Sequence, residues 1–184
     1  MNQEFLIYGL PFFLTMDIFF LSIAGGVTLQ PYQWRVTAKV SAAFIVSQLL
    51  AGAIGLILAS LILPLIIGFS KITAAILIGF FGSKMMQEAV KVKNEQRTFL
   101  LEDSDILLPL SLAGSLNTLV IFLGMGFLQL PYKGSLITLF FSILILSQLG
   151  LFIGSHYRPL RTGRYSKFAG GLVMIILIIL NFVL

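Results

Sequence analysis

The longest uncharged stretch of the chain constrains its fold more than any other feature. From Val40 to Ser70 the sequence contains no Asp, Glu, Lys or Arg, and most of its residues are apolar. A membrane-spanning helix needs about 20 predominantly apolar residues. The stretch is therefore long enough to complete one crossing of a bilayer and to begin a second, and it predicts an integral membrane protein.

The overall composition supports the same class. Of the 184 residues, 58% are hydrophobic and 10% are charged, whereas soluble domains contain about 45–50% apolar and about 25% charged residues. The net charge of +5 does not indicate a nucleic-acid partner, because the basic residues lie between apolar runs, where they orient membrane proteins. With no cysteine and one histidine, the chain is expected to hold no resident metal or haem cofactor. Its apolar composition makes the lipid bilayer its expected surroundings.

Six membrane-spanning helices are predicted, which makes the chain an all-α integral membrane protein. The boundary between the second and third spans is placed at Pro64, since proline suits the start of a helix better than its interior. The predicted spans are Phe5–Val27, Val36–Ser60, Leu65–Met86, Ile106–Leu128, Ser135–Gly154 and Phe168–Leu184.

The basic residues predict the orientation. Lys71 and Lys133 fall on the side of the termini, and ten basic residues fall on the other side. Because cytoplasmic segments are enriched in Lys and Arg, both termini are expected to be extracytoplasmic. The ten residues are Arg35, Lys39, Lys84, Lys91, Lys93, Arg97, Arg158, Arg161, Arg164 and Lys167.

The two halves of the chain resemble each other when the sequence is shifted by 100 positions. The shift places Pro31-Tyr32 on Pro131-Tyr132, Ser47-Gln48-Leu49 on Ser147-Gln148-Leu149, and Asp17 on Asn117. A shift of 96 places Lys71 on Lys167. Three spans per half is an odd number, so the halves are expected to be inverted repeats, at 1–90 and 106–184, joined by a cytoplasmic linker at 91–105.

Asp17 is the one carboxylate predicted to lie deep in a span, because the other six, Glu88 among them, are predicted at helix ends or in loops. Insertion of an aspartate at that depth costs about 2.5–3.5 kcal/mol, and such residues commonly serve ion or proton pathways. The alternative is a structural carboxylate that is hydrogen-bonded between helices. The sharper hypothesis makes Asp17 a cation ligand or proton carrier. Lys84, near the end of the third span, is expected to extend to the surface, with balancing Asp17 as its alternative.

Three amides are predicted to complete a metal site with Asp17. They are Asn117, which is its repeat partner, and the pair Gln48 and Gln148. Hard divalent ions and manganese prefer carboxylate, amide and carbonyl oxygens. Each amide taken alone is better explained as a hydrogen bond between helices. Their pairing across the repeat favours the site.

Several short motifs resemble those of the MntP-type manganese efflux pumps of bacteria, distant members of the lysine-exporter superfamily. Thr15–Phe19 is similar to the family's (S/T)-M-D-A-F, and Phe44–Gln48 followed by Gly55 resembles its F-x-x-x-Q-x-x-x-P-x-x-G. Ile78–Met85 resembles the glycine-rich and basic end of its third span. Ser115–Leu119 resembles its S-(I/L)-D-A-(L/M), with Asn117 where the family has aspartate.

The resemblance implies a secondary transporter in the bacterial cytoplasmic membrane that exports divalent manganese as its substrate by alternating access. It makes Asp17 the charged ligand and Asn117 and Gln48 neutral ligands. Two alternatives stay open: an exporter of another small solute on the same fold, and a degenerate membrane scaffold that does not transport. An enzyme is not expected, because the sequence offers no second deep carboxylate, cysteine or histidine to pair with Asp17.

Overall fold

The structure is a computed structural model that describes residues 3–29, 33–91, 104–157 and 160–183. Within these ranges every regular element is helical and no strand occurs, which confirms the all-α prediction for them. The elements in chain order are α1 (Gln3–Leu14), α2 (Met16–Gly26), α3 (Trp34–Ile66), η1 (Ile67–Phe69), α4 (Ser70–Lys91), α5 (Ser104–Phe127), α6 (Tyr132–Tyr157) and α7 (Leu160–Val183).

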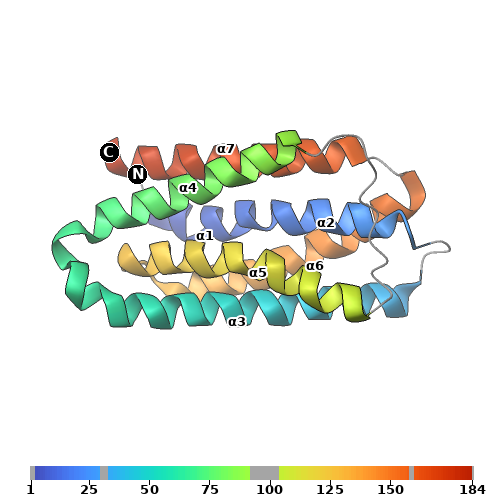
Figure 1. Ribbon diagram of the computed structural model, residues 1–184, viewed down its shortest axis with the longest axis horizontal. Coiled ribbons are helices and arrows are strands. Elements are labelled where there is room, and N and C mark those ends of the chain that lie inside the picture. The colour runs from blue at the N-terminus through green and yellow to red at the C-terminus, as the bar shows by residue number, and fades with distance from the viewer. Residues whose placement is uncertain (1–2, 30–32, 92–103, 158–159, 184) are drawn as a thin grey trace.

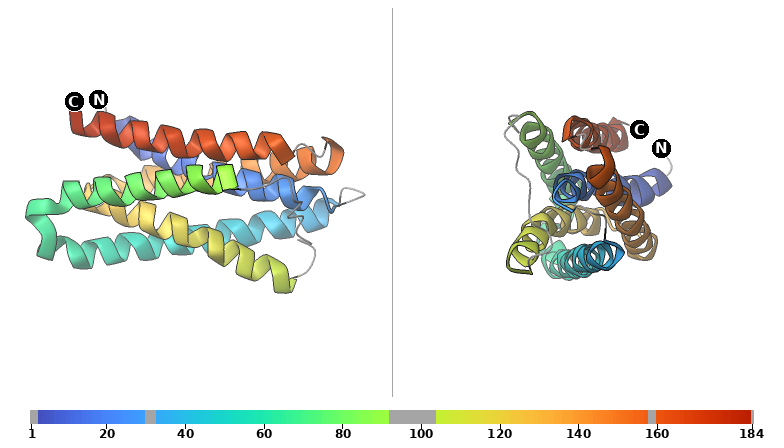
Figure 2. Two further views of the ribbon diagram at one scale, coloured as in Figure 1. Left: turned by 45° about the horizontal axis from the view of Figure 1, so that its top comes forward. Right: turned by 90° about the vertical axis from the view of Figure 1, so that its right-hand side faces the viewer.

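The helices form one elongated bundle, with both chain ends and the η1 turn at the same end of it (Figure 1). α1 leads into α2, and the end-on view of Figure 2 shows α2 in the middle of the other helices. Burial agrees with this position. Of the 11 residues of α2, those buried are Asp17, Ile18, Ser22, Ile23, Ala24, Gly25 and Gly26.

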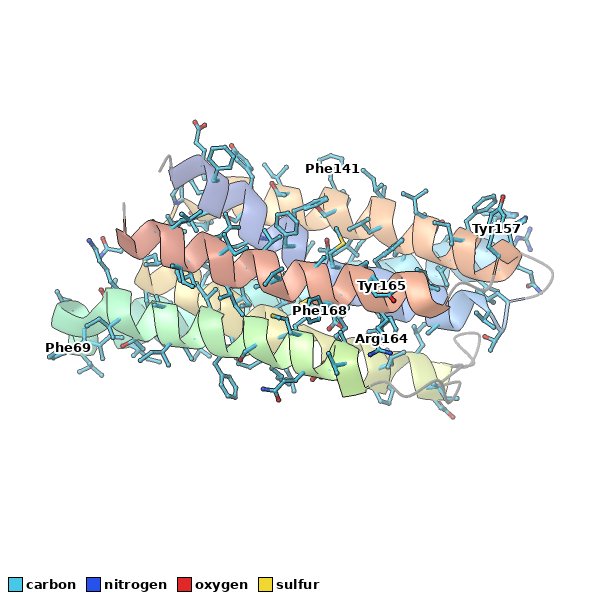
Figure 3. All side chains as sticks on the ribbon, turned by 90° about the horizontal axis from the view of Figure 1, so that it is seen from above. Phe69, Phe141, Tyr157, Arg164, Tyr165 and Phe168 are labelled. Carbon is cyan, nitrogen blue, oxygen red and sulfur yellow. The ribbon has the colours of Figure 1, made fainter. Side chains whose placement is uncertain are left out.

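The outside of the bundle is strongly apolar. Large side chains such as Leu65 (84% exposed), Phe69 (70%) and Phe141 (55%) lie on the surface, and Figure 3 shows Phe69 and Phe141 projecting from the helices. A surface of this kind is unusual in a soluble monomer and suits contact with lipid chains. Five helical stretches of the described chain are long and apolar enough to cross a membrane: Glu4–Gly26, Trp34–Val90, Asp105–Phe127, Tyr132–Tyr157 and Arg164–Asn181.

The predicted break at Pro64 is wrong in its position. Pro64 lies inside α3, the chain turns at Ile67–Phe69, and α4 begins at Ser70, whereas the third span was expected to begin at Leu65. Proline removes one backbone hydrogen bond. Ending the helix in lipid would leave several more backbone groups unpaired, which is costly. The helix therefore continues past the proline to the end of the apolar stretch.

Glycines set the closest helix contacts. Gly55 on α3 packs against the backbone of Leu119 on α5, and Gly150 on α6 packs against the backbone of Phe19 on α2. A methyl group at either glycine would overlap the neighbouring backbone, so these positions let the helices approach closely. The contacts bring α3 close to α5, which carries Asn117, and α6 close to α2, which carries Asp17.

Some predicted features lie outside the described residues. They are most of the linker, at 92–103, the first Pro-Tyr pair at positions 31 and 32, and the basic residues Lys93, Arg97 and Arg158. Lys71 and Lys133, predicted to share the side of the termini, lie in the first turns of α4 and α6, and both are exposed.

Candidate cation site

A break in the first span positions Asp17. At the break, Thr15 Oγ1 donates a hydrogen bond to the Phe12 carbonyl at 2.6 Å, and the Thr15 N–H is shared between the carbonyls of Pro11 and Phe12 at 3.3 and 3.1 Å. Shared bonds of this kind mark the tightened turn at a helix end. Asp17 follows as the second residue of α2, in the first turn, where the helix dipole favours negative charge.

The Asp17 carboxylate is buried, with an ion pair at one oxygen and a hydrogen bond at the other. Its side chain is 8% exposed, and Oδ1 lies 2.6 Å from Lys167 Nζ on α7. Asn117 on α5 donates a hydrogen bond from Nδ2 to Oδ2 at 3.1 Å. The aspartate and the asparagine that the repeat aligns are therefore in direct contact, although they lie 100 residues apart.

Lys167 connects Asp17 to a second carboxylate. Its Nζ donates a hydrogen bond to Glu88 Oε2 on α4 at 2.7 Å and lies 5.6 Å from the centre of the Phe20 ring. The Lys167 side chain is 7% exposed and that of Glu88 is 39% exposed. The ammonium group is thus held between a deep carboxylate and a half-exposed one.

Lys84 completes the group from α4. Its Nζ donates a hydrogen bond to Asn117 Oδ1 at 3.2 Å and lies 3.7 Å from Glu88 Oε1. The Asn117 amide thereby receives a donor on its oxygen and an acceptor on its nitrogen, which is the arrangement that fixes its orientation. The predicted surface position of Lys84 holds in part: its side chain is 43% exposed, while its ammonium group contacts Asn117, the partner of Asp17.

We call these five residues the charged cluster: Asp17, Lys84, Glu88, Asn117 and Lys167. Two carboxylates and two ammonium groups give it a formal charge of zero. Burial of a single charge is expensive, whereas paired charges with additional hydrogen bonds offset much of the desolvation. The cluster also joins four helices, α2, α4, α5 and α7, at one place.

Gln48 and Gln148 lie in contacts of a different kind. Gln48 on α3 accepts a hydrogen bond from the Thr118 hydroxyl on α5. Gln148 on α6 donates to Ser41 Oγ on α3 at 3.0 Å, and Ser147 Oγ lies 2.8 Å from the same atom. We call these five residues the amide contacts. In this conformation each is a neutral hydrogen bond between helices, the simpler of the two interpretations of such residues.

The sequence interpretation missed the roles of Glu88 and Lys167. Glu88 was placed among the carboxylates at helix ends, and Lys167 was assigned to a basic cytoplasmic segment aligned with Lys71. Lys71 is exposed at the start of α4, whereas Lys167 is buried, so the two aligned lysines have different surroundings. Glu88 and Lys167 were missed because they lie near the ends of α4 and α7, and the sequence does not show whether a long side chain at a helix end points inward or outward. The spacing of Lys84 and Glu88 on one helix face was the available signal.

The charged cluster has too few donor groups to surround a metal ion completely. Among the described residues, no group of three or more His, Cys, Asp or Glu side chains is placed to hold a metal ion. The cluster offers two carboxylates and one amide oxygen. Oxygen donors of this type suit hard divalent ions and manganese, which commonly keep waters as further ligands.

Comparison with known proteins identifies the family of the chain. A sequence model of the family described as "Putative manganese efflux pump" matches residues 31–182. The chain belongs to this family. The matched range contains four members of the charged cluster, Lys84, Glu88, Asn117 and Lys167, and begins after Asp17.

Individual relatives cover most of the chain at modest identity. A protein of Cronobacter sakazakii named "Putative manganese efflux pump MntP" is 27% identical over 167 residues, which is 90% of this chain and 89% of the relative. Proteins of the same name from Photorhabdus laumondii and Citrobacter koseri are 27% and 28% identical over 164 and 168 residues, covering 88% and 90% of this chain and 84% and 89% of the relatives. No solved structure matches the chain. The resemblance to the manganese efflux pump family is confirmed.

Proposed function

We propose that this protein exports divalent manganese and that the charged cluster is its cation site. One observation carries the proposal: two carboxylate oxygens, Asp17 Oδ1 and Glu88 Oε2, converge on a single cationic atom at 2.6 and 2.7 Å. A site that places two negative oxygens around one positive centre is built for cations. Membership of the manganese efflux pump family supports the choice of ion.

In this proposal Glu88 supplies the second charge that Asn117 lacks. Asp17 binds the ion as a deep ligand, Glu88 binds it from the exposed side, and Asn117 offers its amide oxygen in exchange for its bond to Lys84. Two carboxylates bring two negative charges to a divalent ion, so the loaded site is neutral once the lysines have withdrawn. The loss of the family aspartate therefore does not remove the charge that the ion needs.

We propose that the helices make six crossings arranged as two inverted repeats, with α3 and α4 as separate spans. Glycine contacts support the repeat. Gly55 meets the Leu119 carbonyl and Leu123 N, and Gly150 meets the Phe19 carbonyl and Ile23 N, so the contacted positions again differ by 100. The glycines themselves differ by 95 rather than 100, as expected if the repeats diverged in loop length.

We propose export by alternating access, from a side with more basic residues to the side of the termini. Lys84 and Lys167 belong to the cluster, which leaves eight of the ten basic residues to orient the chain, against two on the other side. The positive-inside rule then places both termini outside a bacterial cytoplasmic membrane. Glu88, half exposed near the end of α4, is the point at which a cytoplasmic ion first meets the site.

Gln48 and Gln148 are predicted ligands that form other contacts in this conformation. Their amides are bonded to Thr118 and to Ser41 rather than to Asp17. They can serve as ligands only in a second conformation, in which α3 has moved relative to α5 and α6. Rocking of one repeat against the other is a movement of this kind.

Transport into vesicles tests the proposal. Purified protein is reconstituted with a manganese-sensitive dye enclosed, and initial rates are compared for the native chain and for Asp17→Asn, which keeps size and removes charge. We expect the native chain to carry manganese and the variant to lose at least about tenfold in rate, since a single buried charge contact is worth more than 1.4 kcal/mol. Glu4→Gln, at an exposed carboxylate of α1, serves as the matched control and should leave the rate unchanged.

Two outcomes would replace the proposal. Equal rates for the native chain and Asp17→Asn would remove the cluster as the site. No transport by the native chain, with a gain in Asn117→Asp, would favour the degenerate scaffold.

A second candidate function follows from the group that the cluster holds now. An ammonium ion bound by two carboxylates beside the Phe20 ring resembles a site for an organic amine. That candidate predicts that a small alkylammonium ion, added to the vesicles, is itself carried and blocks manganese uptake completely.

A further inference from the structure

We propose that Lys167 is a tethered cation that occupies the manganese site and must leave Asp17 before the metal can bind. This inference rests on the proposed function of the charged cluster and adds the device that regulates it. In this view the conformation described here is the closed, unloaded state. The lysine then sets how tightly the site holds manganese and how readily it releases it.

The position of the ammonium group is the first argument. Lys167 Nζ lies 2.6 Å from Asp17 Oδ1 and 2.7 Å from Glu88 Oε2, so it fills the point on which both carboxylates converge. A divalent ion held by the same two oxygens would need the same point. The ammonium and the metal therefore exclude each other by geometry as well as by charge.

Charge balance is the second argument. The cluster as it stands contains two carboxylates and two ammonium groups, and the side chains of Asp17 and Lys167 are only 8% and 7% exposed. Addition of a divalent ion without any other change would leave a net charge of +2 on a cluster whose inner part, Asp17 and Lys167, is buried, and a low-dielectric interior resists such a charge strongly. Withdrawal of the lysine removes a competing positive charge from the point where the metal must sit.

The packing of α7 shows which part can move. Gly170 lies against the backbone of Phe13 and the side chain of Met85, and Gly171 lies against the Gly82 carbonyl. These close contacts fix the helix backbone one turn after Lys167. The side chain has the freedom that the backbone lacks, since a lysine has four rotatable bonds and its neighbour Glu88 is half exposed.

Glu88 provides the place to which the ammonium can withdraw. Because Lys167 already bonds to Glu88 Oε2, rotation of its side chain toward solvent can break the contact with Asp17 first and the contact with Glu88 last. The metal then takes the place vacated beside Asp17. Return of the ammonium would compete with the metal and assist its release, so the tether couples loading to unloading.

Metal affinity tests this inference directly. Manganese binding to purified protein is measured by calorimetry, and melting is followed in parallel, in a buffer free of primary amines. Lys167→Met removes the charge and retains the length of the side chain. We expect its Kd for manganese to be about tenfold lower than that of the native chain, because a competitor for the same oxygens is gone. Without metal it should melt earlier, and manganese should restore most of the difference.

Matched variants separate this role from a structural one. Lys167→Arg keeps the charge and should keep an affinity near the native value. Lys71→Gln, at an exposed lysine of α4, should bind as the native chain does. In the double variant Asp17→Asn with Lys167→Met the gain in affinity should vanish. In vesicles, Lys167→Met should show a lower half-saturating manganese concentration together with a lower maximal rate, a split that a loss of folding does not produce.

A measurement without metal completes the test. Ethylammonium, which matches the end of the lysine side chain, should raise the melting temperature of Lys167→Ala and leave that of the native chain unchanged. If Lys167→Met binds manganese no more tightly than the native chain, and ethylammonium does not stabilise Lys167→Ala, the tethered cation is rejected. If the native chain carries manganese through Asp17 in that case, the proposed function survives alone. If ethylammonium rescues the variant but no chain carries manganese, the tether survives and the manganese assignment fails.

Discussion

The charged cluster and the amide contacts are two polar regions inside one apolar bundle, and they differ in how their groups are satisfied. In the cluster, four formal charges meet on α2, α4, α5 and α7. In the amide contacts, neutral groups bond to one another between α3 and its neighbours α5 and α6. A neutral hydrogen bond of this kind costs little to bury, whereas a partly buried cluster of charges is costly unless its charges are paired. The comparison supports the charged cluster as the proposed cation site and the amide contacts as hydrogen bonds between helices.

The largest expected effect lies at the centre of the cluster. Asp17→Ala leaves Lys167 with Glu88 as its only carboxylate partner and should lower the free energy of unfolding by about 3 kcal/mol. It should also abolish manganese transport. Melting in detergent and vesicle uptake measure the two effects. A stable, active Asp17→Ala would show that the cluster is dispensable and would erase the contrast.

The next effect comes from restoring a charge. Asn117→Asp gives the cluster a formal charge of −1 and places a second deep carboxylate beside Asp17. We expect manganese to bind about tenfold more tightly, because the added charge attracts the ion in a region of low dielectric. Calorimetry at fixed ionic strength measures this, with Asn117→Leu as the uncharged control. An unchanged Kd would mean that the ion does not reach α5.

A smaller effect is expected at Glu88. Its side chain is 39% exposed, so water compensates part of any lost contact. Glu88→Gln should raise the half-saturating manganese concentration about fivefold and lower stability by roughly 1 kcal/mol or less. Uptake rates over a range of manganese concentrations test this. If Glu88→Gln matches Asp17→Ala in severity, the division into deep and half-exposed ligands is wrong.

The smallest effects belong to the amide contacts. Gln48→Leu and Gln148→Leu should each lower stability by about 0.6 kcal/mol, the average for a hydrogen bond between membrane helices. Uptake should stay within about twofold of native, as expected of a change of that size. A tenfold loss of transport in either variant at unchanged stability would make these glutamines ligands after all and would merge the two regions.

Much of the architecture follows from hydropathy alone. Apolar stretches of membrane length predict helices, because a backbone in lipid must satisfy its own hydrogen bonds, and the described chain is entirely helical outside its turns. The shift of 100 positions predicts that Asp17 and Asn117 are related, and the structure brings them into contact. The local turn after Pro64 could not be predicted, because the proline rule describes a helix in water better than one in lipid.

Hydropathy could not predict the partners of Asp17. From the sequence, Glu88 is predicted at a helix end and Lys167 among the cytoplasmic basic residues, where long side chains commonly extend into water. Which way such a side chain points depends on what the neighbouring helices place within its reach, and that is a property of packing.

By itself the sequence determined that this chain is a bundle of membrane-length helices with one deep acid, because burial of apolar groups and satisfaction of the backbone depend on composition and order along the chain. Only the tertiary structure decided that the acid is paired with a lysine and shares it with a glutamate. Charges interact over a few ångströms in space, and the helices that bring residues 17, 88 and 167 within that distance are far apart in the sequence.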